Sequence, residues 1–104
     1  MSPPDRVFAA LGDPTRLRLV EQLSDGQSRS IQELSAISPI SRQAMTKHRR
    51  VLEEARLVRS ARRGREVRFR IEQAELTHAR NFLAKVAGQW DDALARLANQ
   101  VEER

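Results

Sequence analysis

Residues 41–55 have the hydrophobic pattern of an amphipathic helix. At about 100° per residue, several of their side chains fall on one side of such a helix. That side consists of Ala44, Met45, His48, Val51, Leu52 and Ala55. Ser41 stands at the start, where its hydroxyl can accept a hydrogen bond from a free backbone N–H of the first turn. The pattern therefore predicts a helix over about residues 41–55.

Two short helices are expected at the start of the chain. Residues 5–11 form the first, and Gly12 ends it at a position that suits left-handed backbone. Asp13 caps the second helix, and Pro14 takes its first position, where the missing N–H costs little. The expected apolar faces are Val7, Phe8 and Leu11 in the first helix, and Leu17, Val20 and Leu23, with Leu19 on the flank, in the second.

A third short helix should follow. Ser30-Ile31-Gln32-Glu33 matches a capping box, in which the serine and the glutamate each satisfy a backbone donor. Its buried edge would be Ile31, Leu34 and Ile37, and residues 38–40 would form a tight connection. Two helices joined by such a turn make a helix-turn-helix, in which the second helix reads DNA. We therefore call residues 41–55 the recognition helix.

The pattern changes to that of a hairpin after the recognition helix. Residues 57–63 can form a strand, and Gly64 permits a turn. In residues 66–71 apolar and charged residues alternate, as in a strand with one buried face. A hairpin in this place is the wing of a winged helix, expected over about residues 57–71. The predicted fold class is mainly α with a small β-hairpin: a winged helix-turn-helix of about five helices and a two-stranded wing.

The chain is expected to be helical from residue 74 to about residue 102. Its apolar residues recur at three- and four-residue steps. They are Leu76, Leu83, Val86, Trp90, Leu94, Leu97 and Val101. A single domain of 104 residues cannot cover so long a stripe, so part of it should pack on a second copy. The alternative is a helix that lies back across its own domain. We expect one domain, residues 1–104, with dimerisation helices at both ends.

The charge of the chain is concentrated in residues 42–70. The whole chain carries +5, but this segment holds eleven basic and three acidic residues and is therefore +8, which leaves −3 for the remainder. Such a block suggests a polyanionic partner, with nucleic acid favoured. A membrane surface is disfavoured, since no long apolar run, lipidation signal or secretory leader is present, and we expect a cytoplasmic protein.

Polar side chains suited to DNA occupy the outer side of the recognition helix and the tip of the wing. Guanidinium, amide, ammonium and hydroxyl groups hydrogen-bond base edges and phosphates. The predicted DNA-binding residues are Ser41, Arg42, Gln43, Thr46, Lys47, Arg50, Arg62, Arg63 and Arg65. Three readings compete with this one: a solvated amphipathic helix, a charged hairpin that merely faces solvent, and an interaction module whose basic face meets an acidic protein.

The sequence argues against catalysis, metal binding and a cofactor. It has no cysteine, no glycine-rich phosphate loop, no nucleophile elbow and no metalloprotease spacing. His48 falls within the apolar side of the recognition helix and is interpreted as structural, whereas His78 is interpreted as merely exposed. Asp91 and Asp92 are neighbours on a helix, point about 100° apart and do not form an acid/base pair. We therefore expect no enzyme, no metal site and no cofactor.

With these elements assigned, the chain resembles the ArsR family of bacterial winged-helix repressors from about Val7 to Leu97. The most specific matching segments are residues 8–16, Phe-Ala-Ala-Leu-Gly-Asp-Pro-Thr-Arg, and residues 41–48, Ser-Arg-Gln-Ala-Met-Thr-Lys-His. Residues 51–58 and the Gly64-Arg65 turn add to the likeness. The resemblance implies a sequence-specific, homodimeric repressor that binds a palindromic operator and is released by an inducer.

The resemblance also implies where the dimer forms and what is sensed. The first and last helices form the family's interface, here Val7, Phe8, Leu83, Val86, Trp90, Leu94 and Leu97. Many members sense metals through cysteines or paired Asp and His ligands, which this chain lacks. Trp90-Asp91-Asp92 is closer to the metal-independent branch, in which the inducer is often unidentified. By analogy, an inducer site would be apolar and near the dimer interface.

Two residues depart from the family's pattern. Arg49 stands where a leucine is usual, and we expect its stem to pack while its charged end stays in water. Arg56 stands where glycine usually ends the recognition helix, so it should lose the easy left-handed cap at a cost of up to about 1 kcal/mol. Both residues add positive charge near the expected DNA face.

Overall fold

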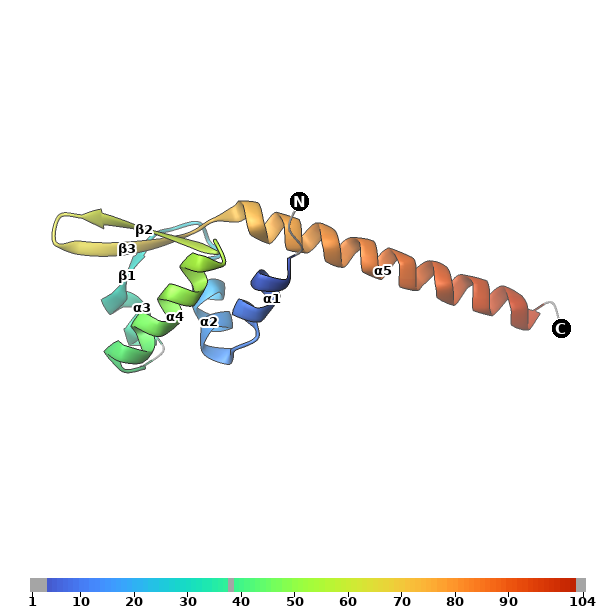
Figure 1. The fold of residues 1–104 in the computed structure, drawn as a ribbon, viewed down its shortest axis with the longest axis horizontal. Coiled ribbons are helices and arrows are strands. Elements are labelled where there is room, and N and C mark those ends of the chain that lie inside the picture. The colour runs from blue at the N-terminus through green and yellow to red at the C-terminus, as the bar shows by residue number, and fades with distance from the viewer. Residues whose placement is uncertain (1–3, 38, 103–104) are drawn as a thin grey trace.

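A computed structural model of the chain describes residues 4–37 and 39–102. Its elements are α1 (Asp5–Leu11), α2 (Pro14–Gln22), β1 (Arg29–Ser30), α3 (Ile31–Ile37), α4 (Arg42–Glu54), β2 (Val58–Arg63), β3 (Glu66–Ile71) and α5 (Gln73–Glu102). The first four helices and the sheet form a compact head, from which α5 extends along the long axis (Figure 1). This arrangement confirms the mainly helical winged helix-turn-helix. Two expectations fall outside the described residues: the burial of the Ile37 side chain and the part of Ser38 in the tight connection.

The N-termini of three helices carry the caps that the sequence predicts. The Asp13 carboxylate accepts from the backbone N–H groups of Thr15 at 2.9 Å and Arg16 at 3.1 Å. The Ser41 hydroxyl accepts from the N–H of Ala44 at 3.1 Å, and the Ser30 hydroxyl accepts from that of Glu33 at 3.1 Å. The Glu33 carboxylate, however, accepts from the Ser30 hydroxyl at 3.3 Å. In the expected capping box it would accept from the backbone N–H of Ser30, so this second hydrogen bond differs from the prediction.

Helices α1 and α4 end with different backbone conformations, at Gly12 and at Arg56 respectively. Gly12 has φ −74°, so the expected left-handed end of α1 is wrong; a Cβ there would lie 3.3 Å from the Ala9 carbonyl oxygen. Arg56 does have the left-handed φ of 59°. Its N–H donates to Glu53 O at 3.0 Å and the N–H of Leu57 donates to Leu52 O at 2.9 Å, which is a Schellman motif. The expectation that Arg56 loses the left-handed cap is thus wrong: the cap forms although the residue is not glycine.

The sheet contains the predicted hairpin and one further strand. β2 and β3 pair antiparallel from Val58↔Ile71 to Arg63↔Glu66, with Gly64 in the turn at φ +66°. The unexpected strand is β1, which pairs with the other edge of β3 through Arg29↔Phe69 and Ser30↔Arg68. Two residues are too few to show a strand's alternation, so this pairing depends on the tertiary contact with β3.

The core lies between α1, α2, α4 and the sheet. Leu23, Leu57 and Val7 are the largest side chains removed almost completely from solvent. From the recognition helix, Met45, Leu52 and Ala55 are buried, as the pattern predicts. The expected face of α2 was partly wrong: Leu19 is 2% exposed and Leu17 is 51% exposed. Either Leu17 or Leu19 could share a buried helical face with Val20 and Leu23. Because α1 and α4 pack on α2, the side with Leu19 is the one that is covered.

Only the first part of α5 packs on the head. Ala79 is buried and Leu76 packs against the core, and α1 contacts α5 through Phe8 and Phe82, whose ring centroids are 5.8 Å apart. Val7, expected from the sequence at a dimer interface, lies in the core at 2% exposure, so its side chain is not part of the exposed surface. Beyond this base, the apolar stripe of α5 is exposed. It comprises Leu83, Val86, Trp90, Leu94, Leu97 and Val101.

Candidate nucleic-acid interface

The outer side of α4 presents all the polar residues predicted to read DNA. Ser41, Arg42, Gln43, Thr46, Lys47 and Arg50 are all exposed. The Ser41 cap and the Schellman motif at Arg56 define the two ends of the helix that carries them. The Thr46 hydroxyl donates to the carbonyl oxygen of Arg42 at 2.9 Å, which leaves its oxygen free to accept. This side of the helix is therefore open and rich in hydrogen-bonding groups.

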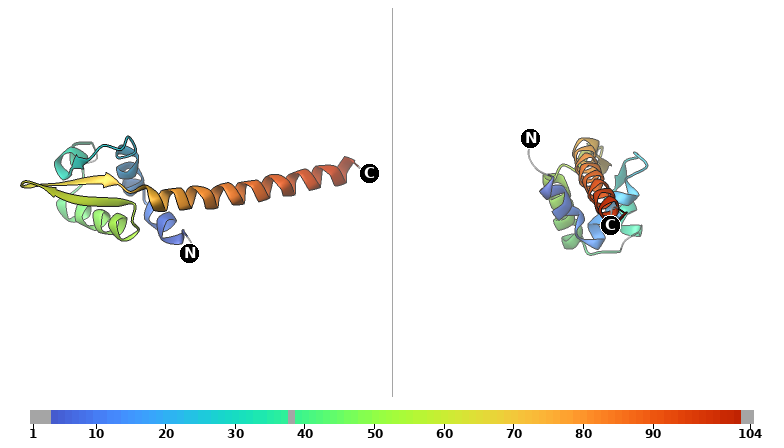
Figure 2. Two further views of the ribbon diagram at one scale, coloured as in Figure 1. Left: turned by 90° about the horizontal axis from the view of Figure 1, so that it is seen from above. Right: turned by 90° about the vertical axis from the view of Figure 1, so that its right-hand side faces the viewer.

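The tip of the wing lies at the same end of the molecule as the N-terminus of α4. Figure 1 and the left view of Figure 2 place both at the end opposite the C-terminus of α5. Arg62, Arg63 and Arg65 surround the turn and are exposed. The start of the recognition helix and the wing tip, which carry these cations, therefore lie at one end of the molecule, while α5, which carries the apolar stripe, extends toward the other end.

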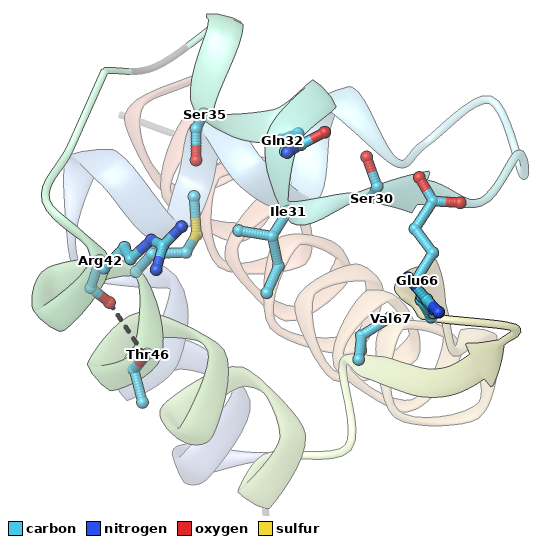
Figure 3. Close-up of a pocket in the computed structure, with 10 residues that line it drawn as sticks. Ser30, Ile31, Gln32, Ser35, Arg42, Thr46, Glu66 and Val67 are labelled. Atoms are coloured by element: carbon cyan, nitrogen blue, oxygen red, sulfur yellow. Dashed lines mark hydrogen bonds between the residues drawn. The ribbon is translucent and has the colours of Figure 1, made fainter.

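A groove lies between the recognition helix and the wing. It has a volume of about 610 Å³ and is lined by residues of α3, α4 and the wing. Figure 3 shows Arg42 and Thr46 on one side, Glu66 and Val67 on the other, and Ile31 between them. Arg65 also lines it. Predicted DNA-binding residues of the helix and of the wing thus meet in one concave surface.

Ion pairing separates the cations of residues 42–70 into two groups. Within residues 4–37 and 39–102, no salt bridge involves Arg42, Lys47, Arg50, Arg56, Arg62, Arg63, Arg65 or Arg70. Three others are paired: Arg49 with Glu53 at 3.6 Å, Arg59 with Glu72 at 3.0 Å, and Arg68 with Glu33 and Glu66 at 3.2 and 3.1 Å. The charge count of the sequence treats all of these cations alike, because Glu72, the partner of Arg59, and Glu33, one of the two partners of Arg68, are distant in the sequence.

The two arginines that depart from the family's pattern lie away from this surface. The Arg49 guanidinium carbon is 6.0 Å from the centre of the Phe69 ring, and its side chain covers part of the core beside Leu19 and Leu23. Arg56 lies at the C-terminal end of α4, near Asp5 and Glu75 of α1 and α5. The expected packing of the Arg49 stem is therefore confirmed. Neither residue lines the groove between α4 and the wing, and a contribution of their charge near the DNA face stays a prediction.

His48 joins the recognition helix to the corner between α1 and α2. Its Nδ1 is 3.2 Å from Nη1 of Arg16, whose Nε donates to the Ala10 carbonyl oxygen at 2.6 Å. The Asp13 carboxylate lies 3.8 Å from the same ring nitrogen. Hydrogen bonds from the backbone N–H of Arg16 above all, then the nearby His48 and the N–H of Thr15, lower the pKa of Asp13 against an opposing effect of desolvation. These contacts agree with a structural role for His48.

The remaining acidic and histidine residues do not form a site in the described part of the chain. His78 lies 3.8 Å from a carboxylate oxygen of Glu75, and Asp91 and Asp92 are exposed on α5. No three metal-ligating side chains gather among the residues that the structure describes. None of the helices in residues 4–37 and 39–102 combines the length and apolarity needed to span a membrane.

Comparisons with known proteins agree with this geometry. A family model described as a helix-turn-helix domain matches residues 11–61. The HTH-type transcriptional regulator Rv2034 of Mycobacterium tuberculosis is 33% identical over 99 residues, which are 95% of this chain and 89% of that protein. A transcriptional repressor SmtB homolog of Synechocystis is 35% identical over 80 residues, 77% of this chain and 58% of that one. A solved ArsR-like transcriptional regulator from Rhodococcus sp. RHA1 superposes with a TM-score of 0.75 at 37% identity, over 90% of this chain and 88% of that one.

Proposed function

Because the chain belongs to the ArsR family of winged helix-turn-helix transcriptional regulators, which are not enzymes, we propose that it is a homodimeric repressor that binds a palindromic operator. The observation that carries this proposal is the position of six exposed cations that form no salt bridge among the described residues: Arg42, Lys47, Arg50, Arg62, Arg63 and Arg65. They lie on the outer side of α4 and on the wing tip, at one end of the molecule (Figure 1).

The recognition helix supplies base contacts in this proposal. In helix-turn-helix docking, the first turns of the second helix reach deepest into the major groove. Arg42 can pair with guanine and Gln43 with adenine, each contributing about 1–3 kcal/mol of discrimination. Ser41, Thr46, Lys47 and Arg50 would contact neighbouring base edges or phosphates. Arg62 and Arg63, at the end of β2, and Arg65, in the exposed turn, would contact the DNA backbone.

The apolar stripe of α5 supports the homodimer. Leu83, Val86, Trp90, Leu94 and Leu97 are between 45% and 64% exposed, although each is a large apolar side chain. Pairing two copies through this stripe, with Phe8 and Phe82 at its base, would bury it. Such a dimer carries two recognition helices related by twofold symmetry, which calls for a palindromic operator.

Repression and an inducer complete the proposal. The relative from Synechocystis is named a transcriptional repressor, which supports the same role here. A dimer bound over a promoter would block access of the polymerase. We place an inducer, as the family implies, at the apolar junction of the two α5 helices, where a ligand could change the spacing of the recognition helices.

Selection of bound sequences from a random pool of DNA tests the proposal. We expect two inverted half-sites whose centres lie about 34–36 Å apart, or a multiple of that distance. A promoter containing the selected site should be less active when the protein is present. Enrichment of single, unpaired half-sites, or an increase in promoter activity, would contradict the palindromic operator or the repressor role respectively.

Salt dependence separates DNA from an acidic protein as the partner. Affinity for DNA should fall with a slope of about 0.9 per phosphate contact in a plot of log affinity against log salt. The family membership supports DNA, and no contact among the described residues favours the alternative of an acidic protein.

A further inference from the structure

Arg68 on β3 differs from the other arginines of the wing in what it touches. Its Nη2 donates to the carbonyl oxygen of Ser28 at 2.8 Å and its Nε donates to the Ser28 hydroxyl at 3.0 Å. Its Nη1 donates to Glu33 Oε1 at 3.2 Å and to Glu66 Oε2 at 3.1 Å. The side chain is 20% exposed, against 75% for Arg59 on the neighbouring strand. Arg68 is therefore turned into the protein.

These contacts join three segments around one guanidinium. Ser28 precedes β1, Glu33 lies in the first turn of α3, and Glu66 begins β3 next to the wing tip. The backbone pair Ser30↔Arg68 brings the same segments together. A guanidinium presents its donors in a fixed plane, so one side chain can hold several acceptors at defined angles.

The two carboxylates that Arg68 contacts lie beside the proposed DNA surface. Glu66 lines the groove between α4 and the wing, together with Arg42 and Arg65 (Figure 3). Glu33 does not line the groove itself, but its Oε1 and the Oε2 of Glu66 accept from the same Nη1 of Arg68. An uncompensated carboxylate here would repel a DNA phosphate. The hydrogen bond to Glu66 and the charge of Glu33 raise the pKa of Arg68, as expected for a cation held between anions.

We propose that Arg68 is a positioning residue for DNA binding, which acts through Glu33 and Glu66 and not through a contact with DNA. It keeps the two carboxylates neutralised and fixed while it holds the wing to the helix before the recognition helix. This inference rests on the proposed DNA-binding function. The proposed role of Arg68 differs from that of Arg63, whose exposed and unpaired guanidinium is available to a phosphate.

A double-mutant cycle with the selected operator tests this role. Arg68→Gln should weaken binding about tenfold, the order expected when charge-assisted hydrogen bonds are left unpaired. The same substitution should cost little in the Glu33→Gln/Glu66→Gln background, because no uncompensated carboxylate remains. Arg70→Gln is the matched control, since it removes an exposed arginine two residues along the same strand, and it should bind nearly as the parent does.

The salt slope provides a second readout. Arg63→Gln should lower the slope by about one, as expected for a lost phosphate contact, whereas Arg68→Gln should leave it at the parent value. Arg68→Lys, which keeps the charge near both carboxylates and is the gentler change for folding, should bind within about threefold of the parent. Thermal unfolding followed by circular dichroism shows that each variant is folded at the assay temperature.

The outcomes that overturn the proposal are distinct. An equal cost of Arg68→Gln in both backgrounds, a slope lowered by about one, or an affinity like that of Arg70→Gln would each contradict it. A tenfold loss in Arg68→Lys would do the same. A parent protein that selects no DNA would contradict the proposed function and this inference together, whereas an uncoupled cycle in a DNA-binding parent contradicts this inference alone.

Discussion

At the scale of single residues, what an arginine touches determines what it can contribute to DNA binding. The unpaired guanidiniums of Arg62, Arg63 and Arg65 retain all their donors for a polyanion. Arg59 and Arg68 have already committed donors to carboxylates of their own chain. The electrostatic attraction to DNA therefore depends on fewer cations than the composition of residues 42–70 suggests.

Residues of the recognition helix and of the wing should fail in different ways when mutated. Gln43→Ala should relax the preference at one operator position, because an amide held on a helix can form two hydrogen bonds with adenine. Arg63→Ala should weaken binding to all sequences alike and lower the salt slope by about one. Affinities for the operator and its single-base variants at matched salt test this. If Gln43→Ala weakens every variant equally while Arg63→Ala changes base preference, the two roles are reversed.

The Asp13 cap should make stability depend on pH in the acidic range. Its pKa is lowered in the folded state, so the carboxylate stabilises the fold above its unfolded pKa of about 3.9 and loses this contribution as pH falls through the lower folded value. Asp13→Asn can still cap but does not titrate. The midpoint of thermal unfolding of the parent should therefore fall more steeply than that of Asp13→Asn below about pH 4. Parallel curves for the two proteins would contradict this linkage.

At the scale of elements, the recognition helix has a good cap at its start and a strained residue after its end. The Ser41 hydroxyl satisfies a backbone donor at the N-terminus, and the Schellman motif satisfies the carbonyls of Leu52 and Glu53. Its left-handed position is occupied by Arg56, a residue with a Cβ. The hydrogen bonds and the burial of Leu52 and Leu57 maintain this conformation despite the steric cost.

Replacing Arg56 by glycine should stabilise the protein. The relief of the left-handed strain exceeds the extra entropy of glycine in the unfolded chain, and we expect a gain of about 0.5–1 kcal/mol in the free energy of unfolding. Glu54→Gly, two residues earlier and within α4, is the control and should lose about 1 kcal/mol. Urea unfolding of the three proteins measures both changes. An equal loss in both variants would show that position 56 carries no relievable strain.

At the scale of the whole molecule, the chain divides its two surfaces between opposite ends. The molecule measures 69 × 28 × 21 Å along its principal axes. Its length comes from α5, a helix of 30 residues and about 45 Å that extends from the small head. The wing tip and the start of α4, which carry the predicted DNA-binding cations, lie at the far end of the head (Figure 2), and the apolar stripe lies along α5. Pairing through α5 would therefore leave both DNA surfaces free.

Charged substitutions in the stripe should dissociate the proposed dimer. Leu83→Glu and Leu94→Glu each place a carboxylate where a partner's apolar side chains would pack, at a cost of several kcal/mol. Asn81→Glu adds the same charge on the opposite side of the helix and should remain dimeric. Sedimentation at micromolar concentration distinguishes the two states. A parent that sediments as a monomer would refute the dimer.

DNA binding should not depend on a metal ion. The chain has no cysteine, and the described residues contain no cluster of ligating side chains. Addition of a chelator, or of a divalent metal at low micromolar concentration, should therefore leave the affinity for the operator unchanged. A reproducible shift with zinc, abolished by the chelator, would contradict this prediction.

The sequence by itself determined the elements whose signals are local. Asp13 and Ser41 cap their helices through neighbours two or three residues away, and the alternation in residues 66–71 forms the predicted strand. The exposed side of the recognition helix follows in the same way, since a period of 3.6 residues separates its buried side from Arg42 and Gln43. Such features need no knowledge of distant parts of the chain.

Only the tertiary structure decided the features that depend on what lies opposite. Strand β1 exists because Arg29 and Ser30 meet β3, and Leu19 is buried in place of Leu17 because α1 and α4 cover that side of α2. Arg68 lies forty residues from Ser28, and its pairing could not be read from composition. Charge and hydrophobicity are properties of a residue, but pairing and burial depend on the distance between atoms that folding brings together.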